Sequence, residues 1–110
     1  MNFDHKLDLL VARREELTQL MSSEQSSVPE AFIRLSKEYA ELSPIVECID
    51  ELRALQNEIA DLGGIVADTG SESAMRSLAE EEMRDARERL PSIEQRLNIL
   101  LLPKNAADEK

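Results

Sequence analysis

Apolar residues recur along this chain at alternating steps of three and four, which is the spacing of one face of an α-helix. We predict the first helix over residues 4–22. Its apolar row consists of Phe3, Leu7, Leu10, Leu17 and Met21. Arg14 stands at the one position of this row where an apolar residue would be expected. Its charge could be buried beside a carboxylate, but we favour an aliphatic stem that packs while the guanidinium reaches water.

A second helix is predicted from Pro29, because proline suits the first turn of a helix and the preceding residues are rich in serine. Pro44 removes one backbone hydrogen bond, so either Ser43 caps a new helix or one long helix bends there. We favour the bend, because the apolar row continues beyond Pro44 with only a local slip of phase near residues 49–55. The row consists of Phe32, Leu35, Tyr39, Leu42, Val46, Ile49, Leu52, Leu55, Ile59, Leu62 and Val66.

A third helix is predicted from about Ser73, after a turn in which Asp68, Gly70 and Ser71 supply turn and capping groups. Pro91 should kink this helix. Its apolar row consists of Met75, Leu78, Met83, Ala86, Leu90, Ile93, Leu97 and Leu100.

Together the three rows predict an all-α fold. We expect an elongated antiparallel bundle of three main helices, with the long second and third helices as a hairpin and the shorter first helix packed along it. The expected shared core is Phe32, Leu35, Tyr39, Leu42, Val46, Ile49, Leu90, Ile93, Leu97 and Leu100. The 110 residues suffice for one domain.

Charge and composition narrow the classes of partner. The 23 acidic and 13 basic side chains give a net charge of -10, which repels phosphate and anionic lipid and favours protein partners. Cys48 is the single cysteine, so an intrachain disulfide is excluded and a reducing compartment is favoured. No apolar run approaches the roughly 20 residues that span a bilayer, and residues 1–8 do not resemble a signal sequence. We therefore expect a cytoplasmic protein without a membrane contact.

Candidate chemistry is sparse. His5 lacks the Glu-x-x-His partners of a helical di-metal site, and Cys48 lies among apolar residues that favour packing over nucleophilic chemistry. Residues 80–89 offer the i,i+4 ion pairs Glu80–Arg84 and Asp85–Arg89, which are typical of a solvated helix face, with a partner-binding strip as the alternative. We predict no catalytic, cofactor-binding or metal-ligating residue. An interaction domain and a self-associating coiled coil both remain open on this pattern.

Three segments carry a resemblance to a known family. The closing "LLLPKNAADEK", residues 100–110, resembles a Leu-Leu-Pro-Lys-Asp-Pro-x-Asp-Glu-Lys signature of bacterial class I peptide chain release factors, type 1. The matching residues are Leu101, Leu102, Pro103, Lys104, Asp108, Glu109 and Lys110. The segments "LSKEYAELSPIVECI", residues 35–49, and "AEEEMRDARERL", residues 79–90, resemble the second and third helices of the family. Asn105 and Ala106 stand where Asp-Pro is usual.

The resemblance implies the N-terminal domain of a translation termination factor. Such a factor reads UAA or UAG in the ribosomal A site and promotes hydrolysis of peptidyl-tRNA. Its Gly-Gly-Gln and Pro-Ala-Thr motifs do not occur in these residues. Residues 1–102 would form the domain, and residues 103–110 would begin a linker to decoding and catalytic domains. The implied partners are the ribosome, at the large-subunit stalk base, and the GTPase release factor; no cofactor is implied, and the isolated domain is expected to be monomeric.

Overall fold

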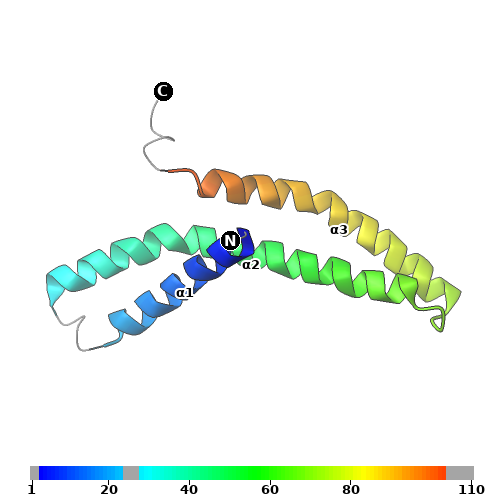
Figure 1. The fold of residues 1–110 in the computed structure, drawn as a ribbon, viewed down its shortest axis with the longest axis horizontal. Coiled ribbons are helices and arrows are strands. Elements are labelled where there is room, and N and C mark those ends of the chain that lie inside the picture. Colours follow the sequence, from blue (N-terminus) through cyan, green and yellow to red (C-terminus); the bar gives the residue numbers. More distant parts are fainter. Residues whose placement is uncertain (1–2, 24–27, 104–110) are drawn as a thin grey trace, which may run out of the picture. The chain divides into compact units, whose positions relative to one another are not determined.

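A computed structural model describes residues 3–23 and 28–103 of the chain. These residues form three α-helices, α1 (Phe3–Met21), α2 (Pro29–Ala67) and α3 (Ser73–Leu100) (Figure 1). No strand occurs within the described ranges, so the all-α prediction is confirmed. The chain divides into two compact units, Met1–Ile49 and Asp50–Lys110, and the boundary falls within α2.

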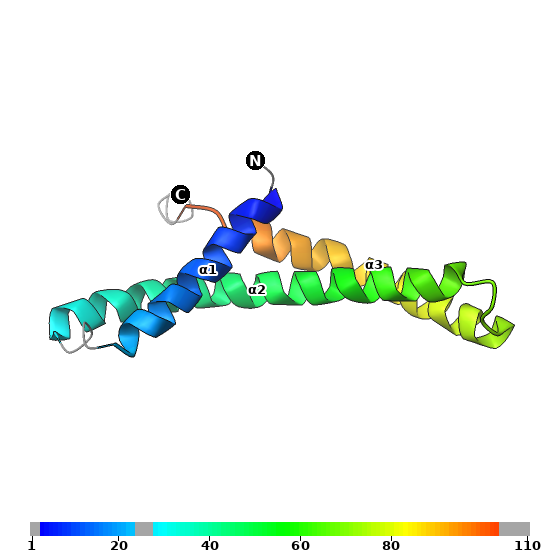
Figure 2. The same ribbon diagram turned by 60° about the horizontal axis from the view of Figure 1, so that its bottom comes forward.

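The first unit contains α1 and the part of α2 that ends at Ile49. The two helices lie side by side in both ribbon views (Figures 1 and 2). Its buried apolar residues are Leu7, Leu17, Val46, Cys48 and Ile49. The predicted rows also included Phe3 and Phe32, but these side chains are 48% and 43% exposed, so their predicted burial is wrong. Both lie in the first turn of their helix.

α2 passes through Pro44 as one helix of 39 residues, so a new helix capped by Ser43 is excluded. Pro44 has no N–H to give to the carbonyl of Ala40. The hydroxyl of Ser43 donates to the carbonyl oxygen of Tyr39 at 2.8 Å, which is a bond that a serine makes inside a helix. The predicted slip of phase near residues 49–55 coincides with the boundary between the two units. The bend at Pro44 stays a prediction.

The second unit is an antiparallel hairpin of the remaining part of α2 and α3. Arg96 on α3 pairs with Glu51 on α2 at 2.8 Å, and Arg89 pairs with Glu58 at 3.4 Å. The two pairs are seven residues apart on each helix, which is the repeat of a coiled-coil register. The predicted hairpin of the second and third helices is therefore confirmed in this unit.

The apolar row of α3 is shifted at its N-terminal end from the predicted one. Ala79, Ala86 and Leu97 are its buried residues. Met75 and Leu78 are 53% and 55% exposed, so their predicted place in the row is wrong. Ala79 lies four residues before Met83 and therefore on the same face of α3. Leu78 is turned by about 100° from Ala79 around the helix axis. Sequence analysis passed over Ala79 because a small side chain contributes little to a hydrophobic pattern.

Pro91 lies inside α3 and does not interrupt it. α3 is drawn as a curved helix in Figure 1, while the kink predicted at Pro91 itself stays a prediction. Among the residues of the expected core, Val46, Ile49 and Leu97 are buried. Six others are partly exposed, namely Leu35, Tyr39, Leu42, Leu90, Ile93 and Leu100. That the remaining members share one core across both units stays a prediction.

Candidate protein interaction surface

The first unit is held at its surface by a charged cluster between α1 and α2. Arg13 makes two parallel hydrogen bonds to the carboxylate of Glu38, from Nε to Oε2 at 2.6 Å and from Nη2 to Oε1 at 2.8 Å. Its Nη1 donates to Glu16 at 2.7 Å. The hydrogen bonds from Arg13 lower the pKa of Glu38, against a smaller opposing effect of desolvation. The cluster thus bridges α1 and α2 at the surface of the first unit.

The sequence left open whether the charge of Arg14 is buried or reaches water. Its guanidinium carbon lies 5.7 Å from the centroid of the Tyr39 ring, at the distance of a cation–π contact. The side chain is partly exposed, so the prediction that the charge is not buried is confirmed. The guanidinium is supported by an aromatic face as well as by water.

The turn between α2 and α3 is held by side chains on both of its sides. Asp68 accepts hydrogen bonds from the N–H of Gly70 at 2.9 Å and from the hydroxyl of Ser71 at 3.1 Å. Arg76, one turn into α3, donates to the carbonyl oxygens of Ser71, Thr69 and Asp68 at 3.0, 3.3 and 3.4 Å. The predicted turn chemistry is confirmed. The capping position is Glu72, whose side chain makes no capping bond.

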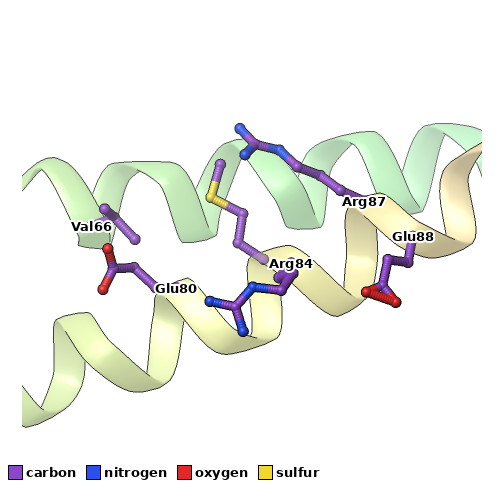
Figure 3. Close-up of a pocket in the computed structure, with 6 residues that line it drawn as sticks. Val66, Glu80, Arg84, Arg87 and Glu88 are labelled. Atoms are coloured by element: carbon purple, nitrogen blue, oxygen red, sulfur yellow. The ribbon is translucent and has the colours of Figure 1, made fainter.

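A groove lies along α3 where the C-terminal end of α2 meets it, close to this turn. Its volume is about 530 Å³, and Val66 of α2 and five residues of α3 line it. The residues from α3 are Glu80, Met83, Arg84, Arg87 and Glu88. Figure 3 shows Val66 and Glu80 at one end of the groove, Glu88 at the other, and the two arginines between them. We call this surface the α2–α3 groove.

The comparisons with known proteins decide the family. The PCRF domain family matches residues 10–110. The chain belongs to this family. Over 110 residues it is 43% identical to peptide chain release factor 1 of Gluconacetobacter diazotrophicus, covering 100% of this chain and 30% of that protein. Peptide chain release factor 1 of Ehrlichia ruminantium is 34% identical over 110 residues, with 100% and 31% covered.

These matches confirm the resemblance to peptide chain release factors of type 1 that residues 35–49, 79–90 and 100–110 carry. The PCRF domain spans about 30% of the length of the curated relatives that it matches. No solved structure matches the chain. Residues 104–110, on which the resemblance of the closing segment partly rests, lie outside the described residues.

His5 and Cys48 are the residues considered for chemistry in this PCRF domain. His5 is exposed on α1, and Cys48 is buried in α2, as its predicted packing role requires. Within residues 3–23 and 28–103, no three side chains of His, Cys, Asp or Glu are grouped so that they could hold a metal ion. In the same ranges, no helix is both long enough and apolar enough to cross a membrane.

The acidic and basic residues of α3 do not pair as predicted. Arg89 bonds to Glu58 on α2, and neither predicted i,i+4 pair within α3 forms. In the part of the chain that the structure describes, Arg84 and Arg87 have no carboxylate partner. Arg89 bonds across the seam between the two helices, to Glu58 of α2, and not along its own helix. Both interpretations of residues 80–89, a solvated helix face and a partner-binding strip, stay predictions.

Proposed function

We propose that this PCRF domain is an accessory domain of a translation termination factor, and that the complete factor reads UAA or UAG and promotes hydrolysis of peptidyl-tRNA on the ribosome. The observation that carries the proposal is the identity of 43% with a peptide chain release factor 1 over all 110 residues. Residues 1–102 form the domain and residues 103–110 begin the linker to the rest of the factor. The complete factor works in the cytoplasm.

Within that factor, the domain makes a protein contact away from the reacting ester. It docks near the stalk base of the large ribosomal subunit and communicates with the GTPase release factor. Its net charge of -10 supports protein contacts, because a strongly acidic surface is repelled by the phosphates of ribosomal RNA.

A competition experiment with the 110-residue chain tests this role. The chain alone should release no peptide from ribosomes that carry peptidyl-tRNA at a stop codon. Added in excess to a reaction with a complete release factor, it should reduce the stimulation of turnover by the GTPase factor and leave single-turnover release unchanged. Peptide release by the chain alone, or unchanged stimulation at saturating chain, contradicts the proposal.

A further inference from the structure

The C-terminal end of α3 is apolar on every side. Residues 99–102 read Ile-Leu-Leu-Leu, and successive side chains of a helix are turned by about 100°, so this run surrounds the helix axis. Ile99 is 59% exposed and Leu102 is 54% exposed, whereas Leu100 and Leu101 are partly exposed. A helical segment that is apolar all round is typical of one that is covered on more than one side.

The backbone at this end of α3 is well formed (Figure 1, orange). The N–H of Leu101, which keeps right-handed helical backbone angles, donates to the carbonyl oxygen of Leu97 at 3.0 Å. The N–H of Leu102 donates to the carbonyl oxygen of Ile99 at 3.1 Å. Since Leu97 is 1% exposed, one side of the helix end is already packed. Ile99 and Leu102 are therefore exposed on the uncovered side of a folded helix end, and not on an unwound one.

The lengths of the related proteins indicate what lies next to this surface. The 110 residues cover 30% of one release factor and 31% of another. This inference rests on the proposed function, in which residues 103–110 begin the linker to the remainder of the factor. A peptide spans at most about 3.6 Å per residue, so residues 103–110 reach no further than about 29 Å. The remainder of the factor therefore begins within that distance of Leu102.

Such a short tether favours the same polypeptide over any separate molecule. A segment joined by a short linker is present at an effective concentration on the order of millimolar. A second copy of the chain or a free partner protein would have to reach that concentration to compete for the same apolar side chains. The tethered part of the factor therefore occupies the surface first.

We propose that the part of the complete factor that follows residue 110 packs on Ile99 and Leu102, so that the end of α3 is an intramolecular docking surface. The contact buries the two most exposed side chains of the apolar run, which is the favourable term. It also holds this PCRF domain to the rest of the factor by packing, in addition to the covalent linker.

Thiol labelling of the free factor tests the contact without a release assay. Ile99→Cys and Leu102→Cys are each made in the 110-residue chain and in the complete factor that contains it, and mass spectrometry follows their reaction with a small water-soluble maleimide. Both introduced thiols should react about tenfold more slowly in the complete factor. The matched control is Leu78→Cys, since Leu78 is 55% exposed near the other end of α3 and should react within about twofold in both proteins.

Equal rates in the two proteins at residues 99 and 102 overturn the proposal. So does slow labelling in the 110-residue chain itself, because that chain or a second copy of it would then cover the surface. Loss of the contact leaves the proposed function intact, since peptide release and its stimulation are measured separately.

A charged side chain at the docking surface supplies the decisive variant. Leu102→Glu, added to the Ile99→Cys factor, should restore the labelling rate of the isolated chain, because a carboxylate cannot be buried there without a partner. Leu78→Glu is the matched control and should leave residue 99 protected. Circular dichroism of both variants checks that the helices are folded. Continued protection of residue 99 in the Leu102→Glu factor overturns the proposal.

Discussion

Arg13 and Glu38 form a two-pronged ion pair that joins α1 to α2, with N–O distances of 2.6 and 2.8 Å. The planar guanidinium matches the carboxylate, so the pair is compatible with only a narrow range of registers of α1 on its neighbour. Both side chains are partly exposed, so solvent screens the pair and its contribution to stability is small. Its main effect is on geometry and on the response of the first unit to pH.

This pair predicts a defined pH dependence. The pKa of Glu38 is lowered by its hydrogen bonds from Arg13, so the unfolded chain takes up its proton at a higher pH than the folded chain. The stability from the pair is therefore present above the unfolded pKa of about 4.3 and is lost as the pH falls through the folded value. Glu38→Gln should lower the urea midpoint at neutral pH, and its deficit should shrink on acidification.

The control for this series is Glu47→Gln, a loss of the same charge at an exposed position of α2 within the same unit. Its urea midpoint should differ little from that of the parent at every pH. If the deficit of Glu38→Gln were constant from neutral to acidic pH, the ion pair would not be its source.

Leu97 provides a prediction for the second unit. The side chain is 1% exposed, so Leu97→Ala should lower the free energy of unfolding by about 2 to 5 kcal/mol, from lost burial and the cavity left behind. Ile99→Ala is the control on the same helix, because Ile99 is 59% exposed and should cost less than about 1 kcal/mol. Urea unfolding of the three chains measures the difference, and equal midpoints for both variants would show that Leu97 is not a packing residue.

The two adjacent glycines of α2 should respond differently to substitution. A Cβ at Gly64 would meet no atom within 4 Å, so Gly64→Ala should raise the free energy of unfolding by about 0.5 to 1 kcal/mol through helix propensity. A Cβ at Gly63 would lie 3.4 Å from the terminal methyl group of Met83, an ordinary van der Waals distance, so Gly63→Ala should gain the same helix propensity and this contact in addition. Thermal unfolding of both variants tests this order, and a clearly smaller gain at Gly63 would show that the Met83 side chain cannot accommodate the added methyl group.

The sequence predicts well where the helices lie, but it predicts poorly which of their side chains are buried. Spacing placed Leu7, Leu17 and Leu97 in buried rows because a three-four period is a direct consequence of helix geometry. It also placed Leu78 in a row, because hydrophobicity outweighs a small residue such as Ala79 in any pattern. Phe3 and Phe32 were misplaced because periodicity shows which residues share a helix face but not how deeply each of them is covered.

Side-chain partners across helices depend on register, which periodicity does not contain. The bonds of Arg13 to Glu38 and of Arg89 to Glu58 join residues 25 and 31 positions apart. One signal was present for the first pair, since Arg13 and Glu38 each directly precede a residue of the apolar seam, Arg14 and Tyr39. The groove gave no signal of its own, because it arises from the local meeting of Val66 with α3.

We expect the isolated 110-residue chain to be a monomer. The seam residues Leu17 and Leu97 are already buried within the chain itself, so a second copy cannot pair through these two positions. Static light scattering over a wide concentration range should give one mass, that of a single chain of 12.4 kDa. A mass that rises with concentration would instead favour the self-associating coiled coil.

The most direct test of the proposed role compares a complete release factor that carries this domain with a variant lacking residues 1–100. On ribosomes saturated with factor, single-turnover peptide release at a stop codon should be the same for both, because the proposed role places the domain away from the reacting ester. In multiple turnover, the GTPase release factor should accelerate the complete factor and have a reduced effect on the truncated one. Loss of single-turnover release on truncation would place the domain in the catalytic arrangement and contradict the account.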